Sequence, residues 1–296
     1  MQWSHMDWPA LRALREHFLD PKGRDYWSSR SLLENYDLSF GERISWKWAA
    51  VLSELQARGW APRPEWRVVD WGCGTGRALR AYFSVFNTAP YQLLDRSSLA
   101  VSYADSKIRE TYPKAERATS GPYLLVLSHV LNEQNNETEN ELLKWVSQSE
   151  AVIWVEPGTR EHSAKLVAIR EKLRPQFSIV APCPHQSACA IPRTPKAWCH
   201  NFAPVPPTVF HDSRWGNFSK ELGIDLRSLP VSFLVLQKAP WTAAQPNRVL
   251  GRPKRLKGSY RTVLCRAEGV ETQTLRAKEA RRQGLGKNPL FFKVLK

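Results

Sequence analysis

The chain has 296 residues, 42% of them hydrophobic, which is enough to bury the core of one large α/β domain with extensions or of two modest domains. Its formal net charge of +15 predicts attraction to a polyanion. No apolar run approaches the roughly 20 residues that cross a bilayer. The N-terminus also lacks a basic stretch followed by an apolar one. We therefore expect no membrane partner and a location in the cytoplasm.

The positive charge is concentrated near the C-terminus. Residues 248–296 contain 14 Lys and Arg but 3 Asp and Glu. Such a segment favours contacts with phosphates. The alternatives are a solvated charged surface and a membrane surface, although no lipid anchor or long basic amphipathic helix supports the second.

Apolar runs alternate with helical repeats along the chain. Residues 1–64 favour helices, most clearly at 45–59, before Pro62 and Pro64 end this region. Strands are predicted at 66–70, 91–95, 123–128, 151–156, 177–181 and 231–237, and helices at 77–86, 137–147 and 160–173. Continuous apolar strands between helices predict a parallel sheet with helices on both faces, a doubly wound α/β fold.

Composition divides the chain into three regions. A helical region at 1–64 precedes an α/β domain at 65–240, which contains a proline-rich insertion at 182–230. A basic extension at 241–296 follows, and we expect it to have little core of its own.

A glycine-rich turn separates the first strand of the α/β domain from its helix. The segment DWGCGTG places Asp70 before three glycines, Gly72, Gly74 and Gly76. Glycines allow a tight turn and close approach to a ligand, and the helix N-terminus after them offers free N–H groups. Asp70 can accept hydrogen bonds from an amine-bearing ligand, and Asp95, 25 residues later, from ribose hydroxyls.

The G-x-G-x-G pattern resembles the S-adenosylmethionine loop of class I methyltransferases. A nicotinamide cofactor, which favours G-x-G-x-x-G, and a structural turn without ligand are the alternatives. Ser128 and His129, at the end of the third strand, stand where such enzymes place a methyl acceptor. Ser128 is a further candidate for cofactor contact and His129 a candidate base, with a structural histidine as the alternative. The Asn/Asp-Pro-Pro-aromatic motif of amino-methylating enzymes is absent.

Cys73 lies in the glycine loop and is expected to pack there. The other four cysteines are Cys183, Cys189, Cys199 and Cys265. A reducing cytoplasm disfavours disulfides, whereas four thiolates suffice for tetrahedral zinc or a cubane iron–sulfur cluster. The C-x5-C-x9-C spacing is looser than a zinc knuckle and favours a cluster, but His185 and His200 keep a zinc site open. Unrelated structural cysteines are the remaining alternative.

Two other chemistries fit this pattern poorly. Pro182-Cys183 matches the Pro-Cys nucleophile of RNA cytosine C5 methyltransferases, but it lies two strands later than in those enzymes. A radical S-adenosylmethionine enzyme usually has a C-x3-C-x2-C run, which this sequence lacks.

Several segments resemble the methyltransferase-like assembly factors of the mitochondrial small ribosomal subunit and their bacterial relatives. These are LSHVLNE at 127–133, WVEPGT at 154–159, CPHQSAC at 183–189, Trp198-Cys199, and RPKRLK at 252–257 leading to Cys265. The resemblance extends from about Trp66 to Arg266 and implies a class I methyltransferase fold. It also implies a [4Fe-4S] cluster on Cys183, Cys189, Cys199 and Cys265.

The resemblance further implies binding to small-subunit rRNA. We expect the basic extension to provide the contacts, through Arg252, Lys254, Arg255, Lys257 and Arg261. Ribosomal proteins are further candidate partners, and DNA is not expected. A cluster would join the insertion to the extension and supply folding free energy there. The chain is then either a factor that binds rRNA during assembly or translation, or an active rRNA methyltransferase.

Overall fold

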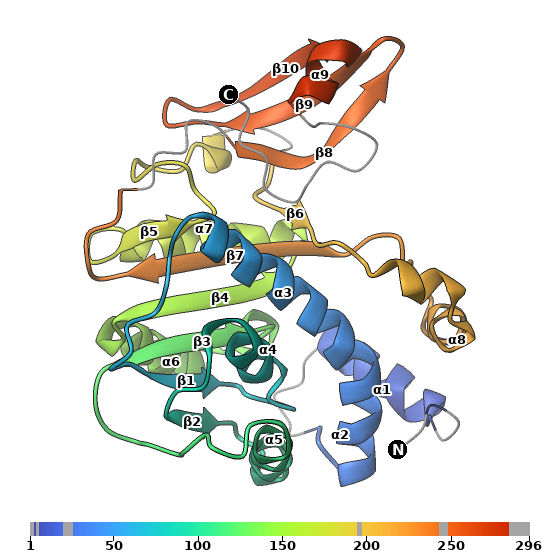
Figure 1. The fold of residues 1–296 in the computed structure, drawn as a ribbon, viewed down its shortest axis with the longest axis vertical. Coiled ribbons are helices and arrows are strands. Elements are labelled where there is room, and N and C mark those ends of the chain that lie inside the picture. The colour runs from blue at the N-terminus through green and yellow to red at the C-terminus, as the bar shows by residue number, and fades with distance from the viewer. Residues whose placement is uncertain (1–2, 4–5, 20–25, 194–196, 243–247, 284–296) are drawn as a thin grey trace.

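The computed structural model describes residues 3, 6–19, 26–193, 197–242 and 248–283. Within them, one sheet has seven strands in the order β2-β1-β3-β4-β7-β5, with β6 paired to β7, and a second sheet has three (Figure 1). The doubly wound α/β architecture predicted from the sequence is confirmed.

Short and mostly apolar strands build the large sheet. They are β1 (Arg67–Trp71), β2 (Tyr91–Leu94), β3 (Tyr123–Ser128), β4 (Ala151–Pro157), β5 (Ser178–Ala181), β6 (Asn201–Phe202) and β7 (Pro230–Gln237). The smaller sheet consists of β8 (Arg248–Leu256), β9 (Ser259–Cys265) and β10 (Val270–Arg276).

Helices precede, connect and follow these strands. They are α1 (Trp8–Leu19), α2 (Arg30–Tyr36), the π-helical turn η2 (Asp37–Gly41), α3 (Glu42–Ala57), α4 (Arg77–Phe86), α5 (Ser98–Thr111), α6 (Asn136–Gln148), α7 (Arg160–Leu173), α8 (Ser213–Leu222) and α9 (Ala277–Arg282). Short 3-10 turns are η3 (Leu131–Glu133), η4 (Ile191–Arg193) and η5 (Pro207–His211). In the described ranges, no helix has both the length and the apolar character needed to span a membrane.

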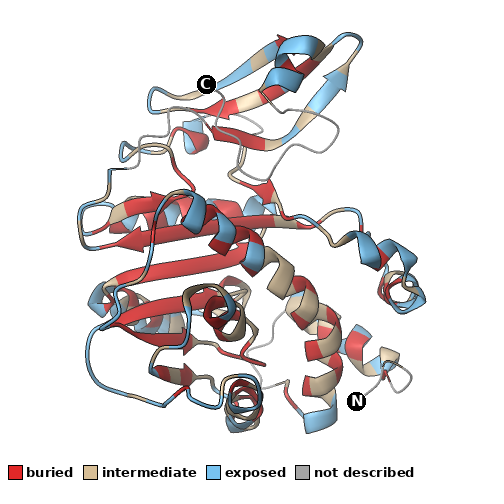
Figure 2. Cartoon of the chain, in the orientation of Figure 1, coloured by how far each residue is buried: buried red, intermediate tan, exposed pale blue. Residues whose placement is uncertain are grey.

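Alternate side chains of each central strand enter two separate cores. In β3, Leu124 and Val126 pack with α3, α4 and α5 on one face, while Leu125 and Leu127 pack with α6 and α7 on the other. All four side chains are completely buried. Figure 2 shows the same burial along the neighbouring strands. At roughly 25 cal/mol per Å² of apolar surface removed from water, this burial is the main stabilising contribution to the domain.

The prediction that the sheet is wholly parallel is wrong at β7. This strand runs antiparallel to β4 and β5, and Gln237 at its end lies opposite both Ala151 and Ser178. The insertion leaves β5 and returns to the same edge of the sheet, so β7 starts where β5 ends. A continuous apolar run reads the same in both directions, so it predicts a strand but not its direction.

The basic extension has a core, contrary to the expectation from its composition. Strands β8, β9 and β10 form an antiparallel sheet, and α9 packs on one face of it (Figure 1). The buried residues of this small core are Val249, Tyr260, Leu264, Leu275 and Ala280. In β9 they alternate with exposed or half-buried residues, a period-two pattern that the many charges obscure in the sequence.

A substitution at Gly158 tests the position of β7. A Cβ there would lie 2.5 Å from the backbone nitrogen of Val231, so Gly158→Ala forces the β7 backbone to move. We expect the free energy of unfolding to fall by about 1–3 kcal/mol. Gly216→Ala is the control, because a Cβ meets nothing within 4 Å there and alanine favours helix α8. Thermal unfolding compares the two; equal stability of both variants would contradict this packing.

Candidate functional site

A cavity of about 860 Å³ lies at the carboxyl ends of β1, β2 and β3. Ligands of doubly wound sheets bind at this edge. The glycine loop forms one wall, and the N-terminal helices and the segment after β3 form the others. The lining side chains include Trp27, Lys47, Asp95, Ser128, His129 and His162.

Hydrogen bonds fix the glycine loop against the end of β2. The carbonyl of Leu94 accepts a hydrogen bond from the amide of Gly72 at 2.7 Å. The carboxylate of Asp95 accepts one from the amide of Gly74 at 2.9 Å and one from Ser97 at 3.0 Å. Gly72 has a φ of +70°, and a Cβ there would lie 2.7 Å from Cγ1 of Val130. Glycine is therefore required for both the turn and the close approach.

The structure brings four of the six predicted cofactor residues to the cavity wall: Gly72, Gly74, Asp95 and Ser128. Gly76 instead packs against α5, where a Cβ would lie 3.0 Å from that of Ala104. Asp70 is 1% exposed, and its carboxylate has no side-chain hydrogen-bond partner in the described part of the chain. Burial raises the pKa of Asp70 to about 7, and the charge of Asp95 adds to the rise. Asp70 thus lies beneath the loop rather than in the wall.

The opposite wall contains Lys47, a residue that the sequence analysis missed. Its Nζ lies 3.0 Å from Nε2 of His129. Burial lowers the pKa of Lys47 to about 7; the charge of Arg43 lowers it further, and Glu156 opposes the shift. Burial also lowers the pKa of His129, with contributions from Lys47 and His162. Both side chains can therefore be uncharged near neutral pH and can accept a proton.

His129 owes its orientation to an unusual backbone. Its φ is +60°, in the left-handed region that few non-glycine residues occupy. Its amide donates to the carbonyl of Val155 at 2.9 Å, and Nε1 of Trp48 donates to the neighbouring Ser128 hydroxyl at 2.9 Å. In the sequence, the feature that could have indicated Lys47 is its place between Trp46 and Trp48, in a helix with a buried apolar face.

A buried carboxylate joins the segments LSHVLNE and WVEPGT. Glu156 of β4 is completely buried and accepts hydrogen bonds from the amides of Val130 at 3.0 Å and Leu131 at 3.2 Å. Nε1 of Trp154 donates to the same oxygen at 2.8 Å. Burial raises the pKa of Glu156 to about 7, and these hydrogen bonds oppose the rise. The turn that carries His129 is therefore fixed from the neighbouring strand.

Ion pairs hold the N-terminal helices over the cavity. Asp37, in the π-helical turn, accepts from Nε of Arg77 at 2.6 Å and from Nη2 of Arg80 at 2.5 Å. Arg77 also donates to Glu42 at 2.7 Å. Both arginines lie on α4, directly after the glycine loop. The helices before the α/β domain are thus part of the site, which nothing in their sequence indicated.

The cysteines of the insertion and of β9 lie in one neighbourhood. Cys189, Cys199 and Cys265 share a small hydrophobic cluster. Burial raises the pKa of Cys265 to about 12; charge on Cys183, Cys199 and Cys189 raises it further, and Arg248 opposes the shift. Thiols separated by up to 82 positions in the sequence therefore lie near enough to affect one another's protonation.

Body elements hold the loops that carry these cysteines. The hydroxyl of Ser163 on α7 accepts from the amide of Cys199 at 2.8 Å, and the hydroxyl of Ser232 on β7 donates to the carbonyl of Cys199 at 2.8 Å. The carboxylate of Glu171 accepts from the amide of Cys189 at 3.1 Å. These bonds satisfy backbone groups that an irregular insertion would otherwise leave unpaired.

Among the residues that the structure describes, no three His, Cys, Asp or Glu side chains are close enough to hold a metal ion. Nε2 of His185 lies 4.0 Å from Sγ of Cys265. His200 is turned away and stacks on Trp198, with ring centroids 4.2 Å apart. Cys73 packs in the core beneath the glycine loop, as expected.

The residues predicted to contact RNA are all exposed: Arg252, Lys254, Arg255, Lys257 and Arg261. Lys254 of β8 lies directly opposite Arg261 of β9. Like charges at opposed positions destabilise a sheet, and a bound anion relieves this repulsion. The guanidinium of Arg252 lies 4.0 Å from the ring centroid of Phe202, which ties β8 to the insertion.

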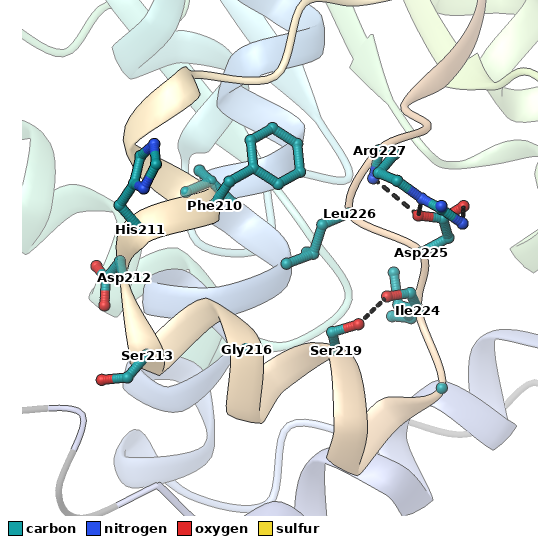
Figure 3. Close-up of a pocket in the computed structure, with 12 residues that line it drawn as sticks. Phe210, His211, Asp212, Ser213, Gly216, Ser219, Ile224, Asp225, Leu226 and Arg227 are labelled. Atoms are coloured by element: carbon teal, nitrogen blue, oxygen red, sulfur yellow. Dashed lines mark hydrogen bonds and ion pairs between the residues drawn. The ribbon is translucent and has the colours of Figure 1, made fainter.

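A second hollow, of about 780 Å³, lies between η5, α8 and the segment before β7 (Figure 3). Phe210 and Leu226 point toward one another across it, and Asp225 at its rim is 2.9 Å from Nε of Arg227. Its other acid, Asp212, is paired with an arginine as well. The hollow offers no glycine loop and its acids are paired, so the larger cavity is the stronger candidate for a cofactor site.

Solved structures to which the chain is similar include three methyltransferases. The mitomycin 7-O-methyltransferase MmcR is 13% identical, with 80% of this chain and 70% of that chain covered and a TM-score of 0.43. The plantazolicin methyltransferase BpumL in complex with SAH is 16% identical, with 77% and 95% covered and a TM-score of 0.42. A SAM-dependent methyltransferase from Aquifex aeolicus is 15% identical, with 47% and 89% covered and a TM-score of 0.33. Comparison with curated proteins gave no match.

A protein-family comparison matches residues 42–286 to a family described as the mitochondrial small ribosomal subunit protein Rsm22. The match includes α3, the glycine loop, all four cysteines outside that loop, and the small sheet. The fold is that of class I, Rossmann-like methyltransferases. The chain therefore belongs to the Rsm22 family.

Proposed function

We propose that this chain is a methyltransferase-like factor of the small ribosomal subunit. It binds S-adenosylmethionine in the cavity, holds a [4Fe-4S] cluster on Cys183, Cys189, Cys199 and Cys265, and contacts rRNA with β8 and β9. It acts in the cytoplasm during assembly of the subunit or during translation. The observation that carries this proposal is that cysteines of the insertion and of β9, distant in the sequence, share one neighbourhood at the joint between the domain with the cavity and the basic sheet.

The shape and chemistry of the cavity support S-adenosylmethionine. Gly72 and Gly74 expose backbone without a Cβ, so the ligand can approach closely. The carboxylate of Asp95 lies in the cavity wall, and carboxylate oxygens can accept hydrogen bonds from ribose hydroxyls. Trp27 and Val101 give the same cavity apolar surface for a base.

Replacing Asp95 tests cofactor binding. We expect Asp95→Ala to weaken the affinity for S-adenosylhomocysteine at least tenfold, because a hydrogen bond to a charged acceptor contributes about 1.5–3 kcal/mol. Isothermal titration calorimetry measures the affinity. Glu110→Ala, on the exposed side of α5, is the matched control and should bind as the unaltered protein does. Unchanged affinity in Asp95→Ala would rule out this mode of binding.

The donor set of the cysteine site fits an anionic metal centre. Buried thiols stay protonated without a metal, and burial raises the pKa of Cys189 to about 11; a bound metal deprotonates them. A single zinc ion requires every sulfur within about 2.3 Å. The described thiols are not gathered closely enough to hold a metal ion as they stand, so the preference for a cluster over zinc rests on the loose C-x5-C-x9-C spacing. Such a cluster, when bound, supplies a redox-active centre and a structural joint. Iron and acid-labile sulfide, rather than zinc, are expected in anaerobically purified protein.

The exposed cations of β8 and β9 support binding to rRNA. The opposed pair Lys254 and Arg261 has no carboxylate partner in the described ranges, so bound phosphate would relieve its repulsion. Affinity should fall steeply with salt, because each neutralised phosphate releases counterions.

Removing the fourth cysteine tests whether the metal site holds this surface in place. We expect Cys265→Ala to reduce bound iron, to speed hydrogen exchange in β8 and β9, and to weaken rRNA binding several-fold. Affinity for S-adenosylhomocysteine should stay nearly unchanged, because the cavity is built from other elements. Filter binding at several salt concentrations and hydrogen-exchange mass spectrometry measure these effects. If Cys265→Ala binds rRNA as tightly as the unaltered protein does, the metal site does not hold the basic sheet in place.

An active rRNA methyltransferase is the second candidate function. The pair Lys47 and His129 favours it, because both groups face the cofactor cavity, burial keeps His129 neutral, and burial lowers the pKa of Lys47 to about 7. A base in that position can accept the proton that a methylated amine or hydroxyl releases.

Labelled S-adenosylmethionine and small subunits from a deletion strain separate the two functions. If the chain is an enzyme, label enters rRNA at one site, and the rate rises as the pH passes through about 7, because Lys47 then loses its proton. Glu156 and His162 lie near Lys47 and also have shifted pKa values, so they contribute to the dependence of the rate on pH. Lys47→Met should slow transfer at least tenfold and flatten that rise, whereas the exposed Lys165→Met should not. If the protein binds the small subunit stably but no label enters the rRNA, the chain is an assembly or translation factor and not a methyltransferase.

A further inference from the structure

Arg248 is a buried cation without a matching anion in the described part of the chain. It is 3% exposed, and its Nη1 lies 3.1 Å from Sγ of Cys199. Its Nε and Nη2 make no hydrogen bond. The nearby acid Glu54 is already paired with Arg58 at 2.6 Å. A buried guanidinium with unmet donors destabilises a fold unless an anion binds beside it.

Strand register places this cation at the cysteine site. Arg248 is the first residue of β8 and lies opposite Cys265 of β9. Opposed residues of an antiparallel pair project from the same face, with Cβ atoms roughly 5 Å apart. Arg248 therefore lies between Cys199 of the insertion and Cys265 of the extension. The register that positions the fourth cysteine also positions the guanidinium.

A second buried arginine borders the site and faces Cys183, but unlike Arg248 it also has a carboxylate partner. Arg170 of α7 donates from Nη2 to the carbonyl of Ser187 at 2.7 Å, and its Nη1 is paired with Glu171. These contacts shape the loop 183–189. The charge of Arg170 is thus balanced by a carboxylate, whereas that of Arg248 is not.

The negative charge of a cysteine-bound cluster would compensate the buried positive charge of Arg248. Four thiolates around a group of charge 2+ leave two negative charges in excess, and reduction adds a third. A buried positive charge stabilises the reduced form more than the oxidised form. We propose that Arg248 raises the reduction potential of the metal centre, by donating an N–H···S hydrogen bond to Cys199 and by compensating negative charge on the sulfurs. This inference rests on the proposed cluster.

The test compares three variants of the full chain, purified anaerobically: Arg248→Gln, Arg248→Lys and Arg193→Gln. Arg193 is the matched control, because it lies in the insertion that carries three of the cysteines but is exposed. Iron and acid-labile sulfide give the occupancy, and a redox titration followed by electron paramagnetic resonance gives the midpoint potential. We expect Arg248→Gln to lower the equilibrium constant of one-electron reduction at least tenfold, about 59 mV. Arg248→Lys should restore part of this loss, and Arg193→Gln should match the unaltered protein.

Each outcome separates this inference from the cluster itself. Unaltered protein with zinc or no metal would overturn the cluster and the inference together. A loaded Arg248→Gln with unchanged potential would overturn the inference and leave the cluster. If Arg248→Gln fails to retain iron, the iron content of Arg248→Lys is the test. A higher iron content in Arg248→Lys than in Arg248→Gln supports the role of charge, and an equal loss of iron in both variants overturns it.

Discussion

Both faces of the large sheet have to be buried, and this constraint determines where polar chemistry can occur. In β3, successive side chains enter opposite cores, so the strand interior has no room for a polar group. Ligand contacts are left to the strand ends, where the glycine loop, Asp95 and Ser128 meet. The N-terminal helices then close the cavity, because Asp37 binds two arginines of the helix that follows the loop.

The buried charged groups depart from that constraint, and each lies at a junction. Glu156 costs free energy to bury, yet its oxygen accepts three hydrogen bonds that fix the turn after β3. Arg58, at the end of α3, donates to the carbonyls of Val180 and Cys183, which ties that helix to the start of the insertion. The hydrogen bonds of these groups position backbone. Lys47 instead faces the cavity beside His129, and Arg248 keeps donors that the described structure does not use, which is why we propose chemical roles for them.

Sequence patterns predicted the parts of this molecule that depend on local chemistry. The helices at 77–86 and 160–173 and the strand at 123–128 have the predicted bounds, and the family match confirms the resemblance. Features that depend on long-range contacts were missed. The direction of β7 depends on where the insertion returns, and the role of Lys47 depends on a histidine 82 residues away. The core of the extension was missed because charged residues hid a two-residue alternation.

The small sheet shows why a joint at the cysteines matters for an RNA-binding surface. The small sheet and its short helix have a core cluster of five buried residues in the described chain, so they bury little apolar surface by themselves. It docks on the insertion through Leu250, Val263 and Cys265, close to Ile191. Arg261, Val263 and Cys265 alternate along β9, so they project from the same face. Val263 and Cys265, at one end of that face, dock on the insertion. Arg261, at the other end, lies opposite Lys254. Whatever holds Cys265 in place therefore also sets the direction in which these cations point.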